Sequence, residues 1–140
     1  MRLLIDTNVI LDILLRREPF FQDSYRALRR ALEQDAECYV SATAATDIYY
    51  ILRKSLQSQE RAKAHLHSLS QLVQFTDVQP ADISNALLAD MPDFEDAVVD
   101  AIAARVGADK ILTRNTKDFV GSAVPAVTPA EFLLNGGGGI

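Results

Sequence analysis

The 140-residue sequence has a single cysteine and no long apolar run. Because a disulfide needs two cysteines, Cys38 cannot form an internal bridge, and so few cysteines are typical of a reducing compartment. No stretch approaches the roughly 18 consecutive apolar residues that indicate a membrane-spanning helix. We therefore expect a cytoplasmic protein without a membrane segment.

The sequence also lacks a basic excess, a glycine-rich phosphate-binding loop, internal repeats and interdomain linkers. It has 14 Lys and Arg against 19 Asp and Glu, a formal net charge of −5, whereas nucleic-acid-binding proteins usually carry an excess of basic residues. Without a phosphate-binding loop, hydrolysis of nucleoside triphosphates lacks its usual machinery. Composition alone disfavours nucleic-acid binding, unless the carboxylates gather at a site where metal cations offset their charge.

What the chain does contain is an alternation of short apolar runs with longer helical patterns. Strands that alternate with helices predict an α/β fold with a parallel sheet covered on both faces. The length suits one domain over residues 1–135, followed by a flexible glycine-rich tail over 136–140. Strands are expected at residues 2–5, 37–40, 73–75, 110–113 and 126–127, and helices from residues 9, 19 and 80, over 42–55, 59–72 and 94–106, and from residue 129.

Four aspartates belong to elements that begin or end at one edge of this sheet. Asp6 directly follows the first strand, and Asp47 lies about one and a half turns into the helix after the second. Asp96 lies in the first turn of the helix that leads to the fourth strand, and Asp118 follows that strand together with Asn115. Because parallel sheets bind ligands at the carboxyl ends of their strands, we expect these carboxylates to converge.

Each of these acids also has an ordinary structural explanation. Asp6 and Asn8 are suitable caps for the first helix. Asp96 is favourable near the positive end of a helix dipole, and Asp118 is a common turn residue. Asp47 is harder to explain, because aspartate is a poor helix former in a helix interior. Each signal is weak alone, but together they indicate a site.

The chemistry that suits such a site is the binding of hard divalent cations. Carboxylates that lie close together repel one another, which raises some of their pKa values unless a cation is bound. Mg²⁺ prefers oxygen ligands and is commonly held by one or two carboxylates together with water and substrate phosphate. One ion activates a water, and a second stabilises the departing oxygen of a phosphodiester displacement. The acids therefore predict one or two Mg²⁺ or Mn²⁺ ions.

Five segments that carry these residues and their surroundings occur in a recognisable order: 4–9, 41–54, 93–97, 113–119 and 128–133. As a set they resemble the PIN-domain nucleases, particularly the bacterial branch that includes the VapC-type toxins of toxin–antitoxin pairs. The resemblance implies a three-layer α/β/α sandwich around a mostly parallel sheet of four to five strands. It also implies a Mg²⁺- or Mn²⁺-dependent endoribonuclease, an antitoxin partner and a homodimer.

The resemblance assigns roles to individual residues as well. The first and third acids of the family match Asp6 and Asp96. Asp47 takes the second place, where related proteins frequently carry glutamate. The fourth ligand is either Asp118 or Asn115, and the latter can instead orient a water. The catalytic and metal-binding set is thus expected to be Asp6, Asp47, Asp96 and Asp118.

Further residues are expected to support these acids or to bind the substrate. Thr7, Asn8 and Thr113 are suited to hold the ligands in place, and Asp100, one helical turn after Asp96, is expected to share its face. RNA phosphates need contacts with cationic side chains, although the net charge of the chain is negative. The candidates near the site are Arg16, Arg17, Arg53, Lys54, Arg114 and Lys117.

Two other functions stay open at this point. Phosphatases of the haloacid-dehalogenase type also place an aspartate after the first strand, with a second aspartate two residues later. That second position is Asn8 here, and Asp47 would have no role. The other alternative is a non-catalytic module that binds RNA or a protein. Such a module has no physical need to keep mutually repelling acids together. Metal binding at the acids therefore discriminates between the nuclease and the non-catalytic module.

Overall fold

A computed structural model describes residues 1–135, and the tail predicted over residues 136–140 lies outside the described residues. Its centre is a five-stranded sheet in which every neighbouring pair of strands is parallel. The strand order is β3-β2-β1-β4-β5, so the first strand lies in the middle. The strands are β1 (Arg2–Ile5), β2 (Glu37–Ser41), β3 (Gln74–Thr76), β4 (Lys110–Leu112) and β5 (Ala126–Val127).

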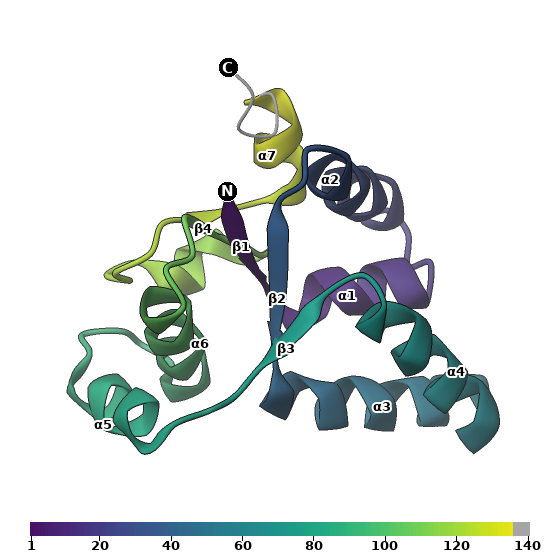
Figure 1. The fold of residues 1–140 in the computed structure, drawn as a ribbon, viewed down its shortest axis with the longest axis horizontal. Helices are drawn as coiled ribbons and strands as arrows, with labels where there is room; N and C mark the ends of the chain where they lie inside the picture. The colour runs from purple at the N-terminus through teal and green to yellow at the C-terminus, as the bar shows by residue number, and fades with distance from the viewer. Residues whose placement is uncertain (136–140) are drawn as a thin grey trace.

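Helices cover both faces of the sheet, which confirms the predicted three-layer fold (Figure 1). One face carries most of the helices, and the other carries α6, with α5 packed on it, and the short 3-10 helix η1 (Thr116–Phe119). The first group comprises α1 (Thr7–Leu14), α2 (Phe21–Glu33), α3 (Ala42–Leu56), α4 (Gln59–Ser70) and α7 (Pro129–Leu134). On the opposite face, α5 spans Pro80–Leu88 and α6 spans Phe94–Arg105.

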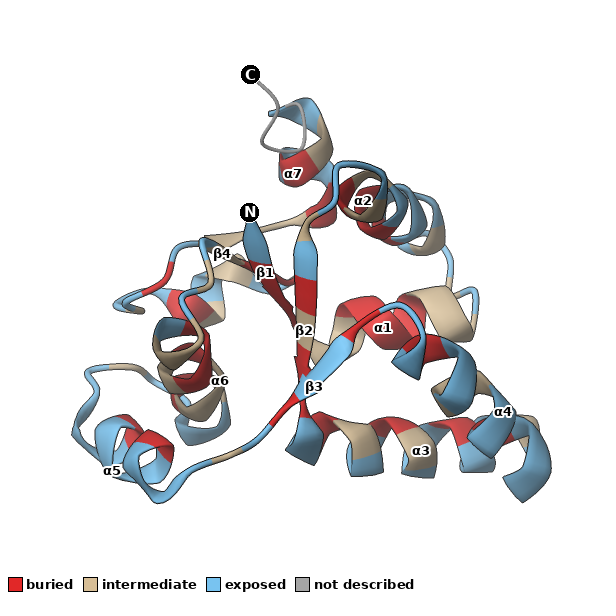
Figure 2. Ribbon diagram, in the orientation of Figure 1, coloured by how far each residue is buried: buried red, intermediate tan, exposed pale blue. Residues whose placement is uncertain are grey.

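The central strand shows why the sequence needs cover on both faces. Leu3 and Ile5 belong to the hydrophobic cluster beneath the larger helical layer, whereas Leu4 belongs to the cluster beneath α6. All three side chains are at most 2% exposed. Figure 2 shows this burial along the strands and on the inward faces of the helices. A continuous apolar strand is typical of a parallel sheet that is buried on both sides.

Several expected boundaries differ from the structure by one or two residues, and two of these differences have a clear cause. The helix α2 begins at Phe21 and not at Pro19, because the amides of Phe20 and Phe21 both donate to the carbonyl of Arg17 and form a separate turn. The strand β3 begins one residue later than expected, because the amide of Val73 still bonds to the end of α4. The predicted stop of α6 at Gly107 is confirmed by its positive φ of 72°.

The structure bears on the expectations about membrane-spanning helices and about Cys38. No helix within residues 1–135 is long and apolar enough to cross a membrane. Cys38 is buried in β2, and this burial raises the pKa of its thiol to about 11. The thiol is therefore a core group and not a reactive one.

Candidate active site

A cleft of about 860 Å³ opens at the carboxyl edge of the sheet, between α1 and α3 on one side and α6 on the other. Its walls contain all four aspartates that the sequence singled out: Asp6, Asp47, Asp96 and Asp118. They come from positions as far apart as residues 6 and 118, and the parallel topology brings them to one edge. The side chain of Glu95 adds a fifth carboxylate to the same cleft.

Asp6 is fixed from several directions at the end of β1. Its Oδ1 accepts a hydrogen bond from the amide of Thr7 at 2.9 Å and so caps α1. Its Oδ2 accepts from the hydroxyl of Thr113 at 2.8 Å and from the side-chain amide of Asn8 at 3.2 Å. Burial raises the pKa of Asp6, and the hydrogen bond from Thr113 partly opposes this increase. Asp6 is therefore both a helix cap and a carboxylate held in the cleft.

Asp96 lies in the first turn of α6, where the Asp93 carboxylate caps the helix by accepting from the Asp96 amide at 3.0 Å. The pKa of Asp96 is raised to about 7, first by burial and then by negative charges around it. These charges belong to Asp6, Asp93, Asp118 and Glu95. The charge of Asp118 also raises the pKa of Asp6. Asp6, Asp96 and Asp118 therefore share one region of negative potential.

The second and fourth predicted ligands, Asp47 and Asp118, differ in their electrostatic effect on Asp6 and Asp96. Asp47 lies on the exposed face of α3 and lines the cleft, but it is not among the charges that raise the pKa of Asp6 or Asp96. Asp118 is electrostatically coupled to both. Asn115 also lines the cleft, and its backbone amide donates to the hydroxyl of Thr113 at 3.1 Å. The cleft therefore contains both of the predicted candidates for the fourth ligand.

The expectation that Asp100 joins the acids is wrong. Both of its carboxylate oxygens accept hydrogen bonds of 2.9 Å, from the backbone amides of Ala123 and Val124. Four residues along α6 displace a side chain by about 6 Å, which is enough to carry Asp100 from the cleft to the loop before β5. Its carboxylate anchors that loop and is buried there.

A buried ion-pair cluster that the sequence analysis did not identify holds two arginines at the edge of the cleft. Asp12 is fully buried, and its carboxylate accepts from Arg17 Nε at 3.1 Å and from Arg114 Nε at 2.6 Å. The guanidinium of Arg114 also lies 3.9 Å from the centre of the Phe20 ring. The sequence does indicate such a cluster, because an acid within the apolar stretch of α1 needs a buried partner.

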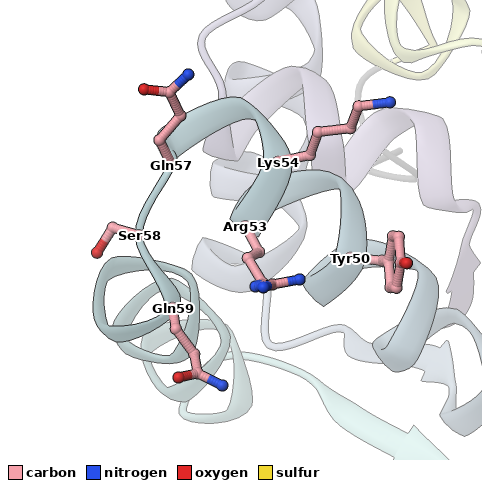
Figure 3. Close-up of a pocket in the computed structure, with 6 residues that line it drawn as sticks. All are labelled: Tyr50, Arg53, Lys54, Gln57, Ser58 and Gln59. Atoms are coloured by element: carbon pink, nitrogen blue, oxygen red, sulfur yellow. The ribbon is translucent and has the colours of Figure 1, made fainter.

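The other predicted phosphate contacts do not line the acidic cleft. Arg53 and Lys54 line a separate groove of about 570 Å³ between the end of α3 and the start of α4 (Figure 3). Tyr50 borders this groove and the acidic cleft. The guanidinium of Arg16 lies over a neighbouring aromatic ring, 5.5 Å from its centre. Neither Arg16 nor Lys117 lines the cleft.

The donor set fits a hard divalent cation that takes only part of its shell from the protein. Within residues 1–135, no three His, Cys, Asp or Glu side chains come close enough to form a complete ligand group. Asp6 and Asp96 nevertheless have raised pKa values, so a bound cation would stabilise their charged forms. Mg²⁺ commonly takes one or two carboxylates and completes its shell with water and phosphate. The cleft therefore suits a cation that keeps water and phosphate ligands, and not one whose ligands all come from the protein.

The raised pKa of Asp96 predicts that the metal-free protein loses stability as the pH rises. Its ordinary value is 3.8 and its value in the folded protein is about 7, so the folded state binds this proton more tightly than the unfolded chain. The resulting stabilisation is complete below the lower value and is lost as the pH rises through the upper one. Urea denaturation in EDTA should therefore show wild-type protein losing stability relative to Asp96→Asn between these values. A difference between the two proteins that does not change with pH would contradict the shift.

The fold and the cleft together define an α/β protein with an acidic cleft at the carboxyl edge of its sheet. The chain belongs to the PIN domain family, whose sequence profile matches residues 2–117. The membership predicted from the sequence is therefore confirmed. Among curated proteins, ribonuclease VapC1 of Aquifex aeolicus (strain VF5) is 24% identical over 136 residues, which cover 94% of this chain and 92% of that protein.

Two solved structures show the same fold. VapBC2 from Rickettsia felis, bound to a DNA fragment from its promoter, superposes with a TM-score of 0.74 at 15% identity, over 91% of this chain and 98% of that chain. Mycobacterium tuberculosis VapC20, a toxin that cleaves the sarcin-ricin loop, superposes with a TM-score of 0.60 at 15% identity, over 78% of this chain and 86% of that chain.

Proposed function

We propose that residues 1–135 form a single nuclease domain that hydrolyses RNA phosphodiester bonds internally with the help of Mg²⁺ or Mn²⁺. The observation that carries this proposal is the electrostatic coupling of Asp6, Asp96 and Asp118 in one cleft. The similarity to ribonuclease VapC1 supports RNA as the substrate. Asn8 argues against the phosphatase alternative, because its side-chain amide donates to Asp6 and cannot serve as an acid.

In this proposal the four cleft aspartates hold the cation, and Asp6 and Asp96 are its principal ligands. A Mg²⁺ or Mn²⁺ ion held by these residues would supply positive charge for the activation of water and the stabilisation of the leaving oxygen. Asp6 is a ligand whose position is fixed by Thr7, Asn8 and Thr113. Asp96 is the second ligand, and without metal it holds a proton in about half of the molecules near its pKa of about 7. Asp118 and Asp47 line the cleft around them.

The arginines at the edge of the cleft are suited to bind the RNA backbone. Arg17 and Arg114 both line the cleft, and their shared contact with Asp12 fixes their position before substrate arrives. Arg53 and Lys54 would contact phosphates farther along a strand that passes Tyr50. Phosphate contacts of this kind set affinity and register and do not read sequence.

The partners that we propose for this chain are inferred from its relatives. A toxin–antitoxin complex from Klebsiella pneumoniae has the same fold, with a TM-score of 0.67 at 22% identity, which supports a toxin that is restrained by an antitoxin. A homodimer and a cytoplasmic location stay predictions. The molar mass of one chain in light scattering would contradict the dimer. The alternative of a non-catalytic binding module makes a different prediction, namely that the acids bind no metal.

The proposal is tested by incubating the purified protein with a mixed pool of cellular RNA and Mg²⁺ or Mn²⁺. Discrete cleavage is expected, and it should disappear in EDTA and in Asp6→Asn. The matched control is Asp35→Asn, which makes the same change at an exposed turn residue with a φ of 59°, a conformation that asparagine tolerates. This control should cut like wild type. Cleavage that persists in EDTA, or that is equal in both variants, would contradict the proposal.

A further inference from the structure

A second pocket, of about 260 Å³, shares Arg114 with the acidic cleft. It lies where the turn before α2 meets the start of α7. Its apolar walls are Pro19, Phe20, Pro129 and Ala130. Because Arg114 lines both cavities, a ligand that occupies this pocket lies next to whatever binds at the acids.

The pocket contains a buried hydroxyl without a partner. Ser24 lines the pocket and is 1% exposed, and its Oγ makes no hydrogen bond to any described residue. Buried polar groups in proteins are nearly always hydrogen-bonded, since an unsatisfied one costs about 1–3 kcal/mol. The Ser24 hydroxyl is thus a polar group in the pocket lining that no described residue satisfies.

The charges around the pocket favour a neutral ligand over an anion. The carboxylate of Asp23 belongs to the lining and would repel a phosphate. The positive charge of Arg114 does little to offset this repulsion, because its Nε and Nη2 already bond to the carboxylate of Asp12. The apolar surface that Phe20 and the two prolines contribute to the lining suits a flat heterocycle. The volume is just below the roughly 300–1,000 Å³ of pockets that hold drug-sized ligands, so it suits a single ring system.

We propose that this pocket binds one RNA base beside the scissile phosphate and that Ser24 helps to determine which base is accepted. The proposal rests on the proposed ribonuclease function. Single-stranded RNA is recognised by bases that leave the stack, pack on aromatic side chains and form hydrogen bonds through their edges. The remaining guanidinium nitrogen of Arg114, Nη1, would bind the phosphate that connects the pocket to the cleft.

Binding is tested by NMR titration of the four nucleoside 5′-monophosphates in EDTA, so that the metal site plays no part. At least one nucleotide should shift the amide signals of residues 20–25 and 128–130. Ser24→Ala should weaken this binding about fivefold, the value of one hydrogen bond. Ala130→Trp fills the pocket and should abolish binding. The matched control is Ala104→Trp, at an exposed position of α6 that does not line the pocket, and it should bind normally.

The same variants are then compared on an RNA with a randomised sequence, and the cut sites are sequenced. Wild type should prefer one base at a fixed position beside the cut, Ser24→Ala should change that preference, and Ala130→Trp should lose it. Absence of nucleotide binding, or binding and preference that neither variant alters, would overturn the base pocket. Nucleotide binding without any RNA cleavage would instead contradict the ribonuclease proposal and leave the pocket standing, so the two failures are distinguishable.

Discussion

Replacing Asp96 with asparagine is expected to lower the rate of RNA cleavage by at least about a thousandfold, or about 4 kcal/mol of activation free energy. The variant keeps the shape of the side chain and removes the charge that a divalent ion requires. The pKa of Asp96 is also raised to about 7, first by burial and then by the negative charges of the cleft. Single-turnover rates at saturating Mn²⁺ measure the effect.

The matched control for this prediction is Glu95→Gln. Glu95 lines the same cleft and contributes to the raised pKa of Asp96, but it is not one of the proposed ligands. Its replacement removes one negative charge and should change the rate less than about threefold, which is under 1 kcal/mol. Equal losses in the two variants would show that Asp96 acts only through the total charge of the cleft and is not a ligand.

Replacing Asp12 with alanine is expected to lower the free energy of unfolding by about 3 kcal/mol. The substitution leaves Arg17 and Arg114 without the carboxylate that both contact, and removing one partner of a buried ion pair commonly costs about 3–5 kcal/mol. We expect the lower end of that range because the two arginine side chains are 38% and 25% exposed, and water can solvate part of their charge. Urea denaturation at neutral pH measures the change.

The control for Asp12 is an exposed ion pair on the same side of the molecule. Arg29 and Glu33 lie one turn apart on α2, 3.7 Å between charged atoms, and both side chains are more than half exposed. Glu33→Ala should change stability by less than about 0.5 kcal/mol. RNA cleavage by Asp12→Ala should also fall, because Arg114 loses the contact that orients it. A variant as stable and as active as wild type would show that the buried cluster has no such role.

The positions of the four cleft aspartates were predictable because they depend on topology. Alternating strands and helices indicate a parallel sheet, and residues that follow its strands or begin its helices gather at one edge. Asp6 and Asp118 are the clearest cases, since each directly follows a strand or the turn after it. The roles of these aspartates as metal ligands stay a prediction until a metal is bound.

What local patterns could not supply is the set of contacts between distant segments. Asp100 has the right helical spacing from Asp96, yet the loop before β5 supplies two amides that bind its carboxylate. Asp12 has an obvious need for a partner, but nothing near it in sequence identifies Arg114, 102 residues away. The strand order likewise depends on pairing between remote segments. Each of these contacts is decided by tertiary packing and not by propensity.

The central claim is that the acidic cleft holds a divalent ion that RNA cleavage requires. Its most direct test is the dependence of the cleavage rate on Mn²⁺ concentration, measured beside Mn²⁺ binding to the same protein by electron paramagnetic resonance. We expect rate and occupancy to rise together in wild type and Asp96→Asn to weaken both. RNA cleavage that is undiminished when no Mn²⁺ or Mg²⁺ is present, or protein saturated with Mn²⁺ that cuts no RNA of the cellular pool, would contradict it.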